Sequence, residues 1–131
     1  MKRPVWIIDD DEDVRAVMVY ALEFEGIQVK AFESATRALE HLHVLENTDY
    51  PSLMIVDYMM PEMDGVEFIG FLKEARETFG KIPVVLSTAR VELDSPTPQG
   101  IEFLNKPLDL SDFLSMVKRY YLNQTPSQPS V

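Results

Sequence analysis

The sequence of 131 residues contains no cysteine, which excludes disulfide bonds and thiolate metal sites. No apolar run approaches the roughly 20 residues of a membrane-spanning helix, so we expect no membrane association. Basic residues are scarce: 12 lysines and arginines stand against 22 acids, a formal net charge of −10. Direct binding to nucleic acid needs a basic face for the phosphates and is therefore disfavoured. Acids follow the first apolar run at once, which argues against a secretory signal, and we expect a cytoplasmic protein.

Apolar residues make up 46% of the chain and charged residues 26%, as in a globular protein with a hydrophobic core. Short apolar or alternating segments predict strands at residues 4–8, 27–32, 53–56, 82–87 and 101–104. Helical spacing follows most of them. In the first predicted helix the apolar stripe is Val14, Val17, Met18, Ala21 and Leu22, and in the last it is Leu110, Phe113, Leu114, Val117 and Tyr121.

This alternation predicts an α/β fold, a doubly wound five-stranded parallel sheet with helices on both faces. Right-handed crossovers leave few strand orders, and the flavodoxin-like order 2-1-3-4-5 is common for this length. That order places the ends of the first and third strands side by side, where such sheets keep their sites. We expect one domain over residues 1–122, and a flexible polar tail or the start of a linker over 123–131.

Polar residues stand at the ends of four of the predicted strands. They are Asp9 and Asp10, Asp57, Ser87 and Thr88, and Asn105 and Lys106. Three carboxylates at one edge repel each other, and a divalent cation removes the conflict. Hard oxygen ligands suit Mg²⁺, and Lys106 balances the remaining charge. Mg²⁺ with a lysine is also what phosphoryl transfer requires, so Asp57 is predicted to be a nucleophile that accepts a phosphoryl group.

These motifs, taken in order, carry a resemblance to a known family. They are IIDDDEDVR, LMIVDYMMPEMDG with Asp57, PVVLSTA with Thr88-Ala89, and FLNKP with Lys106-Pro107. As a set, over about residues 4–122, they resemble the receiver domain of two-component response regulators, chemotaxis regulators among them. The resemblance implies a signalling domain, not an enzyme in the usual sense, that assists its own phosphorylation and dephosphorylation.

The resemblance also implies a metal site. The cofactor would be Mg²⁺, with Mn²⁺ as a substitute ion. Asp10, Asp57 and the main-chain carbonyl of Met59 would bind it directly, and Asp9 would hold it through water. The phosphoryl donor implied is a sensor histidine kinase or a histidine phosphotransfer protein. The downstream target would be an unknown protein or a fused output domain.

The remaining implied roles concern the phosphoryl group on Asp57. Lys106 would pair with Asp57 and later with the phosphoryl oxygens, while the Thr88 hydroxyl and the main-chain N–H of Ala89 would contact them. Phe103 would be the switch aromatic that turns inward when Thr88 moves. The surface around the fourth and fifth strands would then change shape and control a partner.

The sequence departs from the family between Thr88 and Lys106. Pro96 and Pro98 disfavour a helix there, so we expect the fourth helix to be short or missing. Two positions are candidates for tuning the lifetime of the phosphorylated state. They are Met59, two residues after Asp57, and Arg90, two after Thr88; the alternative is that both are merely exposed.

Two alternatives to the phosphoacceptor stay open. A degenerate receiver would serve as a docking module that is never phosphorylated. An aspartate-dependent phosphatase of the haloacid dehalogenase type would carry its nucleophile at Asp9 or Asp11 after the first strand. An EF-hand calcium loop is rejected, because Val14 stands where glycine is needed and Tyr20 where glutamate is needed.

Overall fold

Five parallel strands form one sheet in the order β2-β1-β3-β4-β5, the flavodoxin-like order that the sequence predicts. The strands are β1 (Val5–Ile8), β2 (Val29–Phe32), β3 (Leu53–Asp57), β4 (Val84–Thr88) and β5 (Glu102–Asn105). The computed structural model describes residues 2–46, 49–75, 78–89 and 100–124. In that part of the chain the helices are α1 (Glu12–Phe24), α2 (Ala35–Val44), α3 (Gly65–Glu74) and α4 (Leu110–Leu122).

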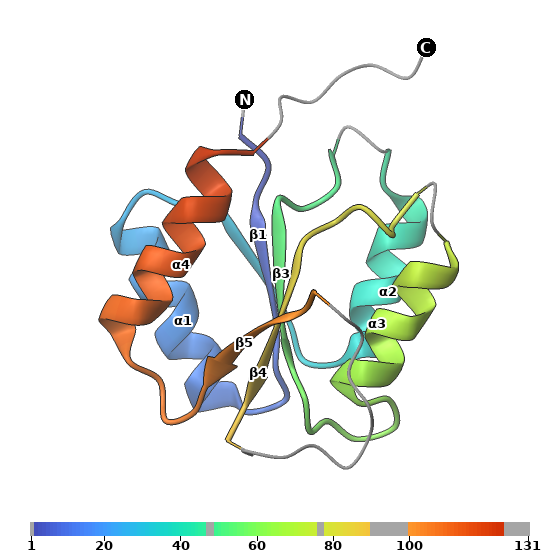
Figure 1. Ribbon diagram of the computed structural model, residues 1–131, viewed down its shortest axis with the longest axis horizontal. Coiled ribbons are helices and arrows are strands. Elements are labelled where there is room, and N and C mark those ends of the chain that lie inside the picture. Colours follow the sequence, from blue (N-terminus) through green and yellow to red (C-terminus); the bar gives the residue numbers. More distant parts are fainter. Residues whose placement is uncertain (1, 47–48, 76–77, 90–99, 125–131) are drawn as a thin grey trace.

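The helices lie in two layers, with α1 and α4 on one face of the sheet and α2 and α3 on the other (Figure 1). Successive residues of a strand point to opposite faces, so each central strand serves both layers. In β1, Val5 and Ile7 pack toward α1 and α4, whereas Trp6 and Ile8 pack toward α2 and α3. Because both faces are covered, β1 is apolar throughout, and β3 is apolar up to its last residue, Asp57.

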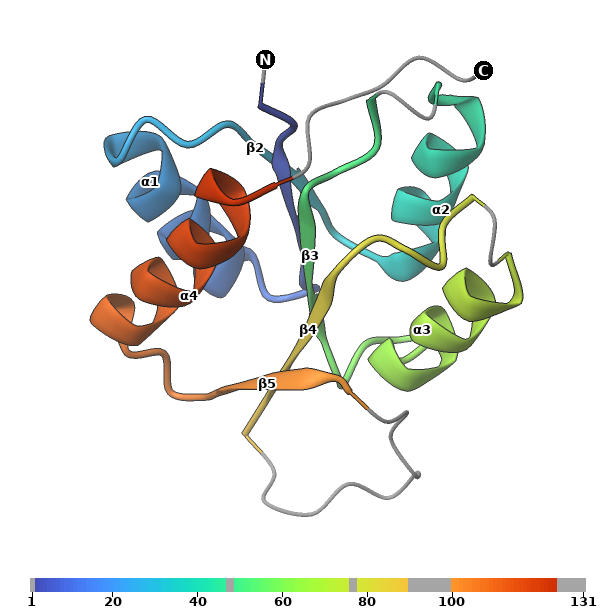
Figure 2. The ribbon, with the colours of Figure 1, turned by 45° about the horizontal axis from the view of Figure 1, so that its top comes forward.

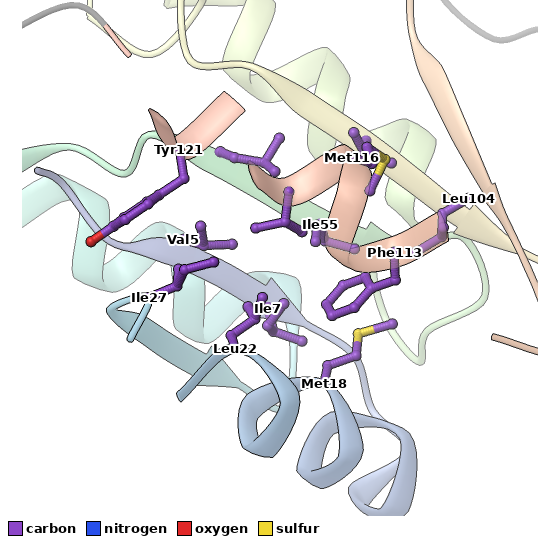
Figure 3. Packing of buried hydrophobic residues seen from close by; sticks show 13 residues of the cluster. Val5, Ile7, Met18, Leu22, Ile27, Ile55, Leu104, Phe113, Met116 and Tyr121 are labelled. Carbon is purple, nitrogen blue, oxygen red and sulfur yellow. The ribbon is translucent and has the colours of Figure 1, made fainter. Parts of the chain in front are cut away.

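The larger core cluster fills the space between the sheet and the helices α1 and α4. Figure 3 shows Met18 of α1 and Phe113 of α4 converging on Ile7 of the sheet. These side chains are fully buried. Burying a side chain of this size contributes on the order of 1.5–3 kcal/mol to the free energy of unfolding. This layer therefore holds α1 and α4 firmly against the sheet whose strand ends carry the polar residues.

Residue types that are typical of helix ends stand at several ends of the helices. Ser34 caps α2 by accepting from the main-chain N–H of Arg37, and Asp64 with Glu67 forms a reciprocal capping box on α3. Gly26, at φ +74°, follows the end of α1 in the left-handed conformation that glycine adopts without strain. The chain therefore enters and leaves these helices at the places that the sequence indicates.

Two positions of the predicted apolar stripes lie outside the core. Val17 is 48% exposed and Leu110 is 45% exposed, although both fall at helical spacing with buried residues. In α1 the buried stripe is narrower and centres on Met18 and Leu22. Helical spacing identifies the inner face but not its width, which depends on how closely the neighbouring elements approach.

Two predictions fall wholly or partly on residues outside the described ranges. The shortened or missing helix between Thr88 and Lys106 concerns residues 90–99, and the tail concerns 123–131, of which only Asn123 and Gln124 are described. Gln124 accepts a hydrogen bond from the main-chain N–H of Arg3 at 2.7 Å, next to the end of α4. Among the described residues, no helix is long and apolar enough to cross a membrane.

Candidate functional site

The ends of four strands meet at one edge of the sheet, where the predicted site residues gather. Parallel pairing sets Asp57 opposite Ser87, and Thr88 opposite Asn105. The next residue, Lys106, continues the pairing by donating its main-chain N–H to the carbonyl of Thr88 at 3.0 Å. On the other side β1 pairs with β3 as far as Ile8 and Val56, so Asp9 emerges level with Asp57. Figure 2 shows β5 lying beside β4 at the side of the sheet away from β2.

The three aspartates that follow β1 differ in burial and in hydrogen bonding. Asp9 is buried, at 2% exposure, and its Oδ1 accepts the main-chain N–H of Asp11 at 2.9 Å. Asp10 is exposed beside it. Asp11 is the N-cap of α1, its side chain accepting from the main-chain N–H groups of Asp13 and Val14. Only Asp9 and Asp10 of this run therefore face the site, and Asp11 is engaged in starting the helix.

Lys106 is shared by two buried carboxylates. Its Nζ lies 3.2 Å from Oδ1 of Asp57 and 3.1 Å from Oδ2 of Asp9. Both acids are buried, and the lysine side chain is only 21% exposed. Charge-assisted hydrogen bonds of this kind fix the geometry of the carboxylates more firmly than an exposed pair would. The pairing of Lys106 with Asp57 was predicted, whereas its equal contact with Asp9 was not.

One ammonium does not balance the negative charge here. Burial, followed by the neighbouring Asp9 carboxylate, raises the pKa of Asp57 from 3.8 to about 7, and Lys106 offsets only part of that. Burial lowers the pKa of Lys106, but Asp57 and Asp9 together outweigh it, so that pKa lies above its usual value. The site thus holds a firmly protonated lysine and an aspartate that needs further positive charge to ionise fully at neutral pH.

The carboxylates form a set of oxygens suited to a hard divalent cation. One oxygen from each of Asp9, Asp10 and Asp57 lies within 4.8 Å of the others. Two of these acids are buried and the third is exposed, so an ion at this place would be open to water on one side. Mg²⁺ favours few protein ligands and several waters, and the raised pKa of Asp57 shows that a cation is electrostatically favoured. The residues present therefore fit Mg²⁺.

Close backbone packing holds the segment just after Asp57. The main-chain N–H of Tyr58 donates to the carbonyl of Ser87 at 2.8 Å, and that of Gly65 donates to the carbonyl of Tyr58 at 2.9 Å. A Cβ on Gly65 would lie 2.7 Å from the carbonyl oxygen of Asp57 and 2.5 Å from Cδ1 of Leu86. The Asp-Gly pair of the sequence therefore serves both a helix cap, through Asp64, and a close approach, through Gly65.

The other predicted residues surround this centre. Thr88 is buried at the end of β4, and Ala89 after it is exposed. Phe103 is 42% exposed on β5, and Met59 is 58% exposed. The carbonyl of Met59 lies two residues beyond Asp57, and its role as a metal ligand stays a prediction. Arg90 lies outside the described residues, so its tuning role stays a prediction.

The structure adds one residue that sequence reasoning missed, Arg15, and a detail of a second, Ser87. Arg15 of α1 donates from Nη1 to the carbonyl of Asp9 at 2.7 Å and so ties the helix to the acid loop. The spacing of Arg15 and Asp9 in the sequence does not predict this contact. The buried Oγ of Ser87 has no hydrogen-bond partner within the described part of the chain, although Ser87 is the register neighbour of Asp57. Ser87 was noted in sequence only as a strand end.

Comparison with known proteins identifies the family. The family model of the response regulator receiver domain matches residues 5–118. The response regulator receiver protein CpdR of Brucella abortus is 34% identical over 122 residues, covering 91% of this chain and 96% of that protein. A receiver domain of a signal transduction histidine kinase from Syntrophus aciditrophicus has a TM-score of 0.78 at 25% identity, covering 98% of both chains.

Longer relatives match over a fraction of their length. The DNA-binding transcriptional regulator NtrC of Proteus hauseri is 34% identical over 122 residues, which is 90% of this chain but 24% of that protein. The chain thus spans about a quarter of the length of the NtrC relatives that it matches. The family match, the strand order and the acidic strand ends agree, and the chain belongs to the response regulator receiver domains of two-component systems.

Proposed function

We propose that Asp57 accepts a phosphoryl group from a phosphohistidine on a sensor kinase or a phosphotransfer protein, with Mg²⁺ as cofactor. The observation that carries this proposal is the ammonium of Lys106, shared between Asp57 and Asp9 beside a third carboxylate. In a salt bridge that only stabilises the fold, one carboxylate is enough to balance one ammonium group. A surplus of anions around a single buried ammonium instead suits a centre that receives more positive charge and then a phosphoryl group.

The chain's own residues account for most of the chemistry. A carboxylate oxygen of Asp57 attacks phosphorus, the phosphorus–nitrogen bond of the donor breaks, and the histidine leaves. The ammonium of Lys106 pairs first with the Asp57 carboxylate and then with the oxygens of the transferred phosphoryl group. The Thr88 hydroxyl and the main-chain N–H of Ala89, at the end of β4, would donate hydrogen bonds to the remaining phosphoryl oxygens. When bound, Mg²⁺ at Asp9, Asp10 and Asp57, with the Met59 carbonyl, would neutralise the equatorial oxygens of the transferring group.

The switch that follows would use Thr88 and Phe103. Leu104 packs toward α1 and α4, so its neighbour Phe103 points to the opposite face of the sheet, where it is 42% exposed. Phosphorylation adds about −1.5 to −2 charge near Thr88. We propose that Thr88 moves toward the phosphoryl group and that Phe103 fills the vacated space. The surface of β4 and β5 would then favour a different partner, a downstream protein or a fused output domain.

Incubation with acetyl phosphate tests the phosphoacceptor without a kinase. Intact-mass spectrometry should show one added phosphoryl group with Mg²⁺ present and none with a chelator. The Asp57→Asn variant should remain unlabelled, whereas Asp49→Asn, a change at an exposed loop acid, should label normally. Labelling of Asp57→Asn at Asp9 or Asp11 would instead favour the phosphatase, and no labelling of the folded wild type would favour the docking module.

A further inference from the structure

A hollow lies at the opposite end of the strands from Asp57. It has a volume of about 290 Å³ and lies between α3, the start of β4 and the start of β5. Its apolar wall includes Ile69, Leu72 and Ile101. From Val84 at the hollow to Thr88 at the acidic edge, the strand spans roughly 13 Å, at about 3.3 Å for each residue. Ligands of this hollow would therefore not contact the phosphoryl site.

The charge around the hollow is the reverse of the charge on the whole chain. The protein carries 22 acids and 12 bases, yet the charged residues that line the hollow are Lys73 and Lys81. Both lysines are exposed, and the described residues include no ion-pair partner for either. Elsewhere in the described structure, Lys106 and Lys118 each pair with acids. The hollow thus combines apolar walls with two exposed lysines that form no ion pair within the described part of the chain.

The other polar group at the rim is already engaged. Tyr120 of α4 lines the hollow, and its Oη donates to Oε1 of Glu102 at 2.8 Å. Glu102 also pairs with Arg119, so that acid is balanced within the protein. The ring of Tyr120 lies 5.3 Å from the guanidinium carbon of Arg119. With the Tyr120 hydroxyl and Glu102 engaged within the protein, polar recognition falls to the two lysines.

We propose that this hollow docks an acidic segment of a partner protein, which inserts one apolar side chain between α3 and β5 and sets carboxylates against Lys73 and Lys81. Charge complementarity selects an acidic occupant, because a basic one would meet two ammonium groups of its own sign. The volume lies at the lower limit of small-molecule sites, ~300 Å³, and exposed residues form much of the rim. An anchoring side chain on a protein surface fits this shape. This inference goes beyond phosphoacceptance and does not depend on it.

Amide NMR of the ¹⁵N-labelled, metal-free full chain tests the proposal. The probe is the peptide acetyl-Asp-Glu-Leu-Phe-Asp-Glu-amide. Gly80 and Gly100 line the hollow, and glycine amides are well resolved, so their resonances should shift and saturate. A peptide with lysines in place of the acids, and one with serines in place of Leu-Phe, should each bind at least about tenfold more weakly.

Charge reversal supplies the matched variants. Lys73→Glu with Lys81→Glu should weaken binding of the acidic peptide by about tenfold or more, and the pair of glutamine variants should weaken it less. Lys30→Glu reverses an exposed lysine on β2, at the opposite edge of the sheet, and should change the affinity by less than about twofold.

Three results would overturn the proposal. They are an absence of saturable shifts at millimolar peptide, equal binding of the basic peptide, and shifts at Gly80 and Gly100 that grow with protein concentration alone. The last result would identify a second copy of this chain as the occupant. Because the assay uses metal-free protein, its failure would leave acetyl phosphate labelling of Asp57 untouched, and failure of that labelling would leave this test intact.

Discussion

Replacing Asp57 by asparagine should stabilise the metal-free protein above pH 7. The pKa of Asp57 rises from 3.8 to about 7 on folding, chiefly through burial and then through Asp9. Between about pH 4 and pH 7 the folded state keeps a proton that the unfolded state has released, so stability falls as pH rises through this window. Each pH unit between the two pKa values is worth about 1.4 kcal/mol, so the wild type loses on the order of 4 kcal/mol by pH 8.

Urea unfolding with a chelator present measures this loss. Trp6, the only tryptophan of the chain, is fully buried and reports unfolding by its fluorescence. The wild type should lose stability from pH 4 to pH 8, whereas Asp57→Asn should be nearly flat and more stable at pH 8. Asp49→Asn removes an equal charge at an exposed position and should change stability by less than about 0.5 kcal/mol. Parallel pH profiles for the wild type and Asp57→Asn would refute the electrostatic reasoning.

Three further substitutions probe the supports of the site. Lys106→Met leaves the Asp9 and Asp57 carboxylates without their ammonium, so the metal-free protein should lose about 3–5 kcal/mol at pH 8 and less at pH 5, by urea unfolding. Gly65→Ala forces a Cβ against Leu86 and the carbonyl of Asp57 and should cost about 1–3 kcal/mol in thermal unfolding, whereas Gly70→Ala on the same helix meets nothing within 4 Å and should be neutral or stabilising. Ser87→Ala removes a buried hydroxyl without a partner in the described chain and should raise the free energy of unfolding by about 1 kcal/mol; a loss instead would mean that an unseen water or ion satisfies it.

Much of the fold follows from local pattern because the signals are short-range. The apolar run of β3 stops at Asp57, and the capping box of Asp64 and Glu67 starts the next helix where the sequence indicates. The strand order then follows from right-handed crossovers, which bring Asp9 and Asp57 to one edge. The exposure of Val17 was not predictable, because spacing along one helix does not reveal how far α4 and the sheet reach around it.

The division of labour inside the acidic site was only partly predictable. Residue type and strand position predicted that Asp9, Asp57 and Lys106 lie at one edge of the sheet. They did not predict that the ammonium of Lys106 contacts both carboxylates, because this depends on the conformation of the lysine side chain. The contact of Arg15 with the carbonyl of Asp9 depends on how α1 leaves its cap. Such contacts arise from packing between distant segments, which no periodicity in the sequence records.

Chemical trapping tests the central claim most directly. After incubation with acetyl phosphate and Mg²⁺, borohydride reduces an aspartyl phosphate to homoserine, and peptide sequencing by mass spectrometry locates the reduced residue. Our account predicts homoserine at position 57 alone, and no reduction when the chelator is present. Reduction at Asp9, Asp10 or Asp11, or none in a protein shown to be folded, would contradict it.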